Sequence, residues 1–181
     1  MIFFIFIFLG LNLVIILLAK ISGMYYNFSM KVNIVCVGKI KEKFFLDAIS
    51  EYQKRLSRFC NFNIIEVDED SKETSIQKKK ETEGRRILEK CSPVFVALEI
   101  QGKMLSSTEI ANFVKEKQVS GVSEISFVIG GSNGLSDEVL KKATLLLSFG
   151  KITFPHQLFR VVLTEQIYRA FTIINGLPYH K

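Results

Sequence analysis

Short apolar runs alternate with longer amphipathic stretches from Met30 to the end of the chain. Apolar runs bounded by turn residues are typical of β-strands, and apolar residues at intervals of three and four are typical of helices. The predicted strands span residues 31–38, 62–67, 94–100, 125–131 and 145–154. The predicted helices span residues 43–58, 76–91, 106–118, 137–144 and 157–174. This alternation predicts an α/β domain with a mostly parallel sheet flanked by helices.

The third predicted strand, residues 94–100, is too apolar for a sheet with one solvated face. We therefore expect helices on both faces of the sheet. Two helix starts are well marked. Ser106 precedes Glu109 by three residues, which is the spacing of a capping box. Ser136 precedes two acidic residues, which suit the positive end of a helix dipole.

The last predicted helix carries two apolar stripes instead of one. The first stripe contains Leu158, Val161, Val162 and Tyr168. The second contains Phe159, Leu163, Ile167, Ala170 and Ile174. A helix that covers a sheet needs only one apolar face. Two stripes indicate burial on both sides, which favours a subunit interface, and the alternative is a helix buried within a single core.

Residues 1–29 form a hydrophobic stretch of a different kind. From Ile2 to Ala19 only Gly10 and Asn12 interrupt the apolar run, which is long enough to span a bilayer as a helix. The stretch lacks the basic start and the small-residue cleavage site of a secretory signal. Because a strand pattern begins directly after Met30, we interpret residues 1–29 as an extension outside the fold and residues 30–181 as one domain.

Composition narrows the classes of protein. A hydrophobic content of 48% excludes a disordered chain, and a formal net charge of +6 suits an anionic partner such as nucleic acid. The three cysteines, Cys36, Cys60 and Cys91, are odd in number and have no C-x-x-C spacing. They indicate neither a disulfide framework nor a zinc site, and we expect buried, reduced thiols in a cytosolic protein.

Glycines cluster after three successive predicted strands. They are Gly102, then Gly130, Gly131 and Gly134, and finally Gly150. Ligands of open α/β sheets bind at the carboxyl ends of strands, where glycine lets the backbone approach a ligand closely. The chain has neither G-x-G-x-x-G after its first strand nor the G-K-[ST] of a phosphate-binding loop. The pattern therefore predicts a pocket that is not an ordinary dinucleotide or nucleoside triphosphate site.

Four segments taken together resemble a known family: LEIQGKMLSS, FVIGGSNGLS, LSFGKITFPHQLFRVVLTEQIYRAF and the closing PYHK. They are similar to the small SPOUT-class methyltransferases that modify N3 of a pseudouridine in large-subunit (23S) ribosomal RNA, the RlmH family. The resemblance extends over residues 30–181. It implies a SPOUT-type trefoil-knotted α/β domain, one of the few exceptions to unknotted topology. It also implies S-adenosylmethionine as methyl donor, no metal, and a homodimer.

The resemblance implies which residues bind the cofactor. The family's donor site corresponds to Leu98, Gly130, Phe149, Gly150, Lys151, Ile152, Thr153 and Phe154. These residues lie in or beside the turns that the glycine pattern indicates. Backbone N–H and C=O groups and apolar contacts are sufficient to hold an adenine ring. Methyl transfer from a sulfonium depends chiefly on in-line positioning of the reactants.

The same resemblance implies four catalytic candidates. The C-terminal tail closes the active site in this family and is expected to reach the partner subunit's pocket, which makes Tyr179 and His180 candidates. Pseudouridine N3 must lose its proton, and an imidazole near the methyl group is a suitable base. His156 follows Pro155 beside the donor loop, and its alternative role is an ordinary hydrogen bond at a helix start. Arg160 is a candidate for contacting phosphate or base, with a plain salt bridge as the alternative.

The sequence thus predicts a cytoplasmic rRNA (pseudouridine-N3)-methyltransferase that uses S-adenosylmethionine and acts on the large subunit or the assembled ribosome. No RNA-binding module is appended, so RNA recognition is expected to rely on shape and phosphate contacts. Two alternatives stay open. One is a non-catalytic RNA-binding protein of the same fold, and the other is a membrane-anchored protein that uses residues 1–19.

Overall fold

The computed structural model describes residues 30–181. The predicted extension of residues 1–29, and with it the membrane-anchor hypothesis for residues 1–19, lies outside the described residues. Within residues 30–181 no helix combines the length and the apolar character needed to cross a bilayer.

Strands and helices alternate throughout the described part of the chain, as the hydrophobic pattern predicts. The strands are β1 (Lys31–Val37), β2 (Asn61–Val67), β3 (Phe95–Met104), β4 (Glu124–Ile129) and β5 (Leu145–Ser148). The helices are α2 (Lys43–Leu56), α3 (Ile76–Leu88), α4 (Ser107–Val119), α5 (Asp137–Lys142) and α6 (His156–Ile174). Both predicted caps are present: Ser106 and Glu109 form the capping box of α4, and Ser136 caps α5.

The sheet is entirely parallel, in the strand order β2-β1-β4-β3-β5. In its middle Ile34 of β1 pairs with Ile64 of β2 and with Phe127 of β4. Because the strands are parallel, all their carboxyl ends meet at one edge. The strands β4, β3 and β5 are neighbours, so the glycine-bearing segments that follow β4 and β5 lie on either side of β3.

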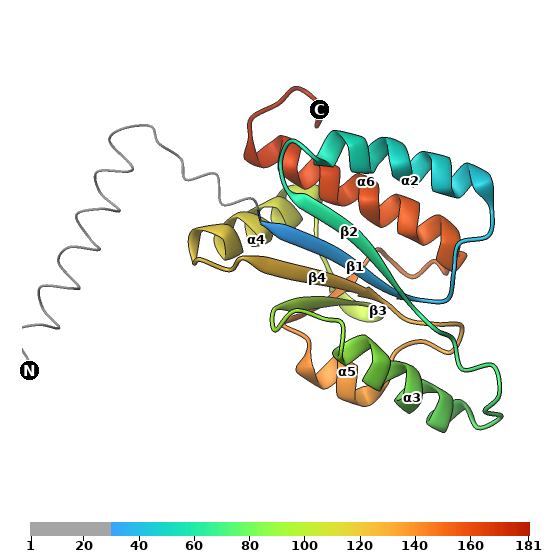
Figure 1. Cartoon of the computed structure of the whole chain (residues 1–181). Coiled ribbons are helices and arrows are strands. Elements are labelled where there is room, and N and C mark those ends of the chain that lie inside the picture. Colours follow the sequence, from blue (N-terminus) through green and yellow to red (C-terminus); the bar gives the residue numbers. More distant parts are fainter. Residues whose placement is uncertain (1–29) are drawn as a thin grey trace, which may run out of the picture.

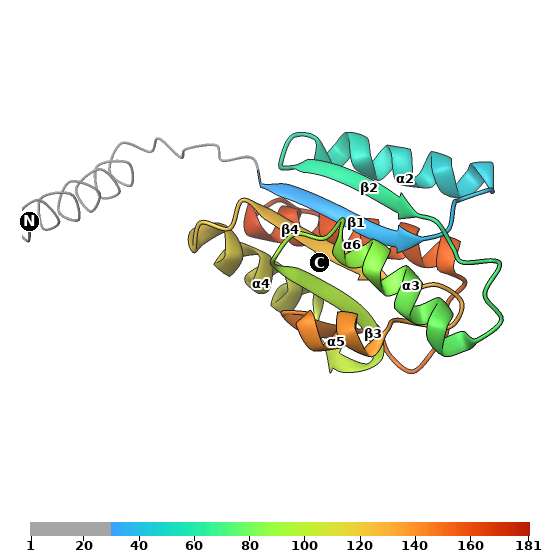
Figure 2. The ribbon, with the colours of Figure 1, turned by 60° about the horizontal axis from the view of Figure 1, so that its bottom comes forward.

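Helices cover both faces of the sheet, which confirms the prediction from the apolar strands. The helices α2, α6 and α4 lie on one face, with α6 between the other two, and α3 and α5 lie on the opposite face (Figures 1 and 2). Side chains alternate along each strand between the two layers. In β1, for example, Ile34 and Cys36 face the α2–α6–α4 layer, whereas Val35 and Val37 face the α3–α5 layer.

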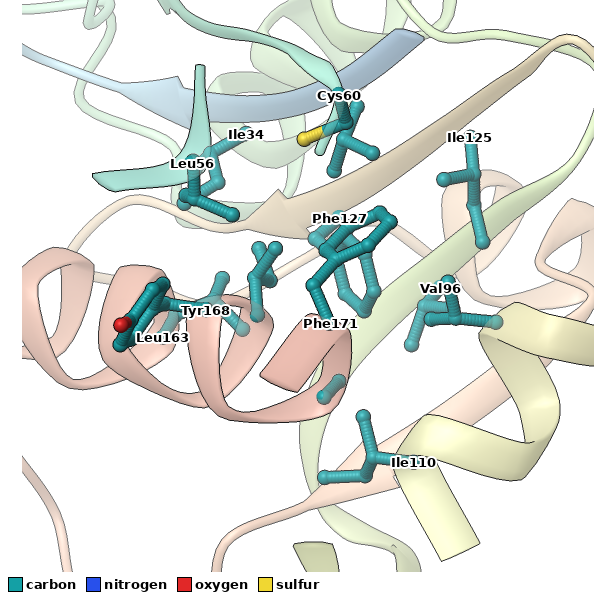
Figure 3. Close-up of a cluster of buried hydrophobic side chains, with 14 of the residues drawn as sticks. Ile34, Leu56, Cys60, Val96, Ile110, Ile125, Phe127, Leu163, Tyr168 and Phe171 are labelled. Carbon is teal, nitrogen blue, oxygen red and sulfur yellow. The ribbon is translucent and has the colours of Figure 1, made fainter. Parts of the chain in front are cut away.

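The larger of the two cores fills the space between the sheet and α6. It contains Phe127 at its centre, with Phe171, Leu163 and Tyr168 from the helix around it (Figure 3). All four side chains are at most 5% exposed. Dispersion contacts and burial of these rings and alkyl groups fix the helix on the sheet.

The predicted interface stripes of the last helix need correction. Leu163, Ile167 and Ala170 are buried in the chain's own core, and so is Tyr168 of the other stripe. The alternative of a helix buried within a single core accounts for these residues, because α6 is flanked by α2 and α4 as well as by the sheet. The residues that still face outward are Leu158, Val161 and Val162, which are exposed or half-buried.

Two strand ends differ from the prediction by four residues or more. The last strand ends at Ser148 instead of continuing to residue 154, because the Ser148 hydroxyl binds the Ile100 carbonyl (3.0 Å) and accepts from the Gly150 N–H (3.2 Å). Gly150 then has φ +108, which turns the chain out of the sheet. The third strand continues past residue 100 through a bulge, so Gly102 lies within β3 instead of after it.

We expect Leu163→Ala to destabilise the protein by about 2–5 kcal/mol, the cost of a cavity in a packed core. The measurement is the free energy of unfolding from urea titration. Val119→Ala is the matched control, because Val119 is 81% exposed on α4 and its loss should change stability by less than about 0.5 kcal/mol. Equal effects of the two substitutions would contradict the placement of Leu163.

Candidate active site

A pocket lies at the carboxyl ends of β3, β4 and β5, where the start of α6 closes it. It is mainly apolar. Its lining residues are Leu98, Glu99, Ile100, Ile129, Gly130, Gly131, Gly134, Leu135, Leu147, Phe149, Gly150, Ile152, Thr153, Phe154, His156 and Phe159.

The turn after β4 forms one wall and requires glycine for steric reasons. Gly131 and Gly134 pair across the turn, and the Gly134 N–H donates to the Gly131 carbonyl (2.9 Å). Gly134 has φ +81, a conformation that side chains disfavour. A Cβ on Gly130 would lie 2.8 Å from the carbonyl carbon of Gly134. The bare backbone of this turn is therefore exposed to any ligand in the pocket.

The opposite wall consists of aromatic rings from the loop after β5 and from α6. Phe159 makes an edge contact with Phe149, with ring centroids 5.1 Å apart, and stacks on Phe154 at 5.5 Å. These contacts fix the loop of residues 149–155 against the first turn of the helix. The site residues predicted from the sequence do not include Phe159. The feature that could have identified it is an aromatic residue shortly after the donor loop.

The structure brings the predicted cofactor-binding residues together with one exception. Leu98 and Gly130 line the pocket, as do the loop residues from Phe149 to Phe154 apart from Lys151. The Lys151 side chain is exposed and does not line it. His156, a predicted catalytic residue, lines the pocket from the first turn of α6 with its side chain exposed.

Arg160 lies in a different environment from the one expected of a substrate-binding residue. It is 1% exposed. Its guanidinium donates to Glu66 Oε1 (3.0 Å) and to the carbonyls of Val37 (2.7 Å) and Gly38 (3.0 Å). These bonds tie α6 to the ends of β1 and β2. The geometry favours the alternative of a salt bridge, in a buried form, and a positioning role for Arg160.

The C-terminal tail is held on the second half of α6. The Tyr179 hydroxyl donates to Glu165 Oε1 (3.0 Å), and the same oxygen accepts two bonds from Arg169 (2.6 and 3.0 Å). The Tyr179 ring packs edge-on against Tyr168 at 4.8 Å and lies below the Arg169 guanidinium, also at 4.8 Å. Burial, together with the neighbouring Glu165, raises the pKa of Tyr179. Its hydroxyl therefore stays protonated at neutral pH and acts as a donor.

His180 lies beside the same cluster, with Nδ1 3.5 Å from an Arg169 Nη1 atom. Neither His180 nor Tyr179 lines the pocket of its own chain. At 1.5 Å per residue, Arg169 is roughly 20 Å from His156 along the helix axis. Glu165, the other residue that holds the tail, is roughly 14 Å from His156, so the tail lies on the second half of α6 and the pocket at its first turns.

The cysteines take no part in this site. Cys36 and Cys60 are buried and Cys91 is half-buried, all as free thiols. Burial raises the pKa of Cys36 to about 11 and that of Cys60 and Cys91 to about 12, so none is a ready thiolate. In residues 30–181 no three histidine, cysteine or carboxylate side chains converge as metal ligands do.

Comparison with known proteins identifies the family of the chain. Residues 30–180 match the family described as "Predicted SPOUT methyltransferase". The chain is 52% identical over 159 residues to ribosomal RNA large subunit methyltransferase H of Streptococcus uberis, a match that covers 84% of this chain and all of that protein. Proteins of the same name from Lactobacillus acidophilus (54% over 160 residues) and Carboxydothermus hydrogenoformans (50% over 159 residues) match with the same coverage. This chain therefore belongs to the SPOUT methyltransferase family, together with these ribosomal RNA large subunit methyltransferase H proteins.

Proposed function

We propose that this protein transfers a methyl group from S-adenosylmethionine to N3 of a pseudouridine in large-subunit ribosomal RNA. The observation that carries the proposal is the pocket itself. Two of the three turns that the sequence marks by their glycines, those after β4 and β5, come together in one apolar cavity, and the family resemblance assigns residues of both turns to the donor. Relatives that match over their whole length carry the name of ribosomal RNA large subunit methyltransferases.

The pocket fits the adenosyl part of the donor. An adenine ring is planar, apolar on its faces and rich in hydrogen-bonding atoms at its edge. Phe149, Phe154 and Phe159 provide apolar surface, and the glycine turn of residues 130–134 provides accessible backbone groups. When bound, S-adenosylmethionine supplies an electrophilic methyl group on a sulfonium.

The residues of this chain then have to hold the pseudouridine ring and accept its N3 proton. Attack by N3 forms the carbon–nitrogen bond as the carbon–sulfur bond breaks, and the N3 proton passes to a base. His180 and His156 are the candidates, because a neutral imidazole has a ring nitrogen that can accept a proton. Tyr179, whose hydroxyl stays protonated, is suited to stacking on the base and to fixing the tail in place.

We infer further that the complete site is formed by two copies of the chain. The donor pocket lies at the first turns of α6, and the tail is held on its second half by Glu165 and Arg169. A second copy, packed through the outward residues Leu158, Val161 and Val162 of α6, would bring its tail to the first copy's pocket. The trefoil knot, the homodimer and the cytoplasmic location follow from the resemblance and are parts of this proposal.

The direct test uses the purified full-length protein, S-adenosylmethionine with a labelled methyl group, and ribosomes from a strain that lacks the gene. We expect one label per ribosome, on a large-subunit pseudouridine, with the methyl at N3 when the nucleoside is analysed by mass spectrometry. Donor binding without any methylation of ribosomes or free ribosomal RNA would favour the alternative of a non-catalytic RNA-binding protein.

Gly130→Val should abolish binding of S-adenosylmethionine in isothermal calorimetry. A side chain at this position would be forced against the Gly134 backbone and would distort the turn that lines the pocket. Gly121→Ala is the matched control. Gly121 has a positive φ, +82, unlike Gly130, but it lies in the α4–β4 connection and a Cβ there meets nothing within 4 Å. The control should bind the donor normally, and loss of binding in both variants would indicate general instability instead.

Deletion of Tyr179 to Lys181 should leave donor affinity within about twofold and lower the rate of methyl transfer by at least about a hundredfold, the scale of a lost positioning or acid–base group. The measurements are calorimetry and single-turnover methylation of ribosomes. Deletion of Lys181 alone is the control, because it retains both Tyr179 and His180. A truncated protein that methylates at the normal rate would exclude the tail from catalysis and leave His156 as the remaining histidine candidate.

A further inference from the structure

Glu83 is a buried carboxylate directly behind the pocket wall. It belongs to α3, a helix whose other charged residues are exposed or half-buried. Only Glu83, Gly84 and Ile87 of this helix are buried, and Glu83 is 2% exposed. Because a carboxylate is normally kept at the surface, its place among the core-facing residues of α3 needs a reason.

The hydrogen bonding of Glu83 is incomplete. Oε1 accepts from the Asp70 N–H (3.1 Å), but the buried Oε2 has no partner. Lys79, on the preceding turn of α3, pairs with Glu69 instead (2.8 Å). Among residues 30–181 no cation forms an ion pair with Glu83. A buried oxygen without a hydrogen-bond partner destabilises a protein, so an orphan of this kind points to a role in function.

The free oxygen faces the glycine turn. A Cβ on Gly131 would lie 2.8 Å from Glu83 Oε2, so a side chain at this position would displace the carboxylate. Gly131 itself lines the pocket. Gly84, the next residue on α3, has no room for a side chain either, because Ser136 occupies that space. Two glycines thus let α3 approach so closely that the backbone of one residue separates the carboxylate from the cavity.

The other charged groups near the pocket are neutralised or solvated. Glu69 is bound by Lys79 and accepts from the Ser132 hydroxyl (3.4 Å). Glu99 lines the pocket but is only half-buried, so solvent screens its charge, and His156 lines the pocket with its side chain exposed. Glu83 differs from these because its carboxylate is both buried and unpaired.

We propose that Glu83 makes the pocket select the cationic methyl donor over the demethylated product. The inference rests on the proposed function. S-adenosylmethionine carries a sulfonium, whereas S-adenosylhomocysteine, which remains after transfer, has an uncharged thioether and otherwise the same groups. The negative charge of a poorly solvated carboxylate behind the pocket wall attracts the positively charged sulfur of S-adenosylmethionine. It does not attract the uncharged sulfur of S-adenosylhomocysteine. Glu83 therefore holds the donor and favours release of the product, as a specificity-determining residue that touches neither.

The test is Glu83→Gln in the full-length protein, with calorimetric affinities for both ligands. The amide has nearly the same shape, and its oxygen can still accept from Asp70. We expect the affinity for S-adenosylmethionine to fall about tenfold, the scale for loss of one charge at short range in partly buried surroundings, and the affinity for S-adenosylhomocysteine to stay within about twofold. Glu81→Gln is the matched control on the exposed side of α3, and it should change neither affinity.

Two results would overturn the inference. An equal loss of affinity for both ligands would mean that Glu83 only shapes the turn. Unchanged affinities would mean that its charge does not affect binding in the pocket. A wild-type protein that binds neither ligand would instead contradict the proposed function itself.

Lys79→Gln gives an independent reading if Glu83→Gln folds poorly. Removal of this cation leaves more net negative charge beside the pocket, because Glu69 and Glu83 both lose its field. The ratio of donor to product affinity should therefore rise, by about threefold for a more distant charge. Damage to the structure would not raise this ratio of affinities. A ratio that falls or stays constant would contradict the proposal.

Discussion

The buried guanidinium of Arg160 ties α6 to the sheet, and the arrangement of the site depends on that tie. Its bonds to Glu66 and to the carbonyls of Val37 and Gly38 connect the first turns of the helix to the ends of β1 and β2. Charge-assisted hydrogen bonds of this kind offset the cost of burying the ion, although Nε remains without a partner. With the helix fixed, His156 and Phe159 close the pocket, and the aromatic core around Phe127 and Phe171 holds the remainder of α6 on the sheet.

One helix therefore carries both halves of the proposed chemistry, and its rigidity keeps them apart. The donor pocket lies at its first turns, while Glu165 and Arg169, which hold the tail, are roughly 14 and 20 Å from His156 along the helix axis. A helix packed on three sides cannot bend to bring its ends together. The separation is the physical reason for proposing that a second copy supplies the tail. It also gives the outward residues of α6 a role that the intrachain core does not explain.

The sequence was sufficient for the features that depend on local pattern. The alternation of strands and helices, the caps at Ser106 and Ser136, and a pocket at the glycine turns all follow from spacing and residue type. The features that it could not supply depend on contacts between distant segments. The sequence alone makes Arg160 a candidate for binding substrate, because its ion pair with Glu66 of β2 joins segments that are far apart in the chain. The sequence alone makes Leu163 and Ile167 candidates for a subunit interface, because it does not show that α2 and α4 pack on either side of α6. The sequence does not distinguish Glu83 from the other charged residues of its helix, because its burial follows from the close approach of Gly131.

The most direct test of the central claim, a site shared between two copies, is complementation between two inactive proteins. One carries Gly130→Val and lacks a donor pocket, and the other lacks Tyr179 to Lys181. When the two are unfolded together and refolded as an equal mixture, random pairing should restore about a quarter of wild-type methylation, since half of the dimers are mixed and each has one intact pocket facing one intact tail. A mixture no more active than its components would show that pocket and tail act within one chain, and would contradict the account.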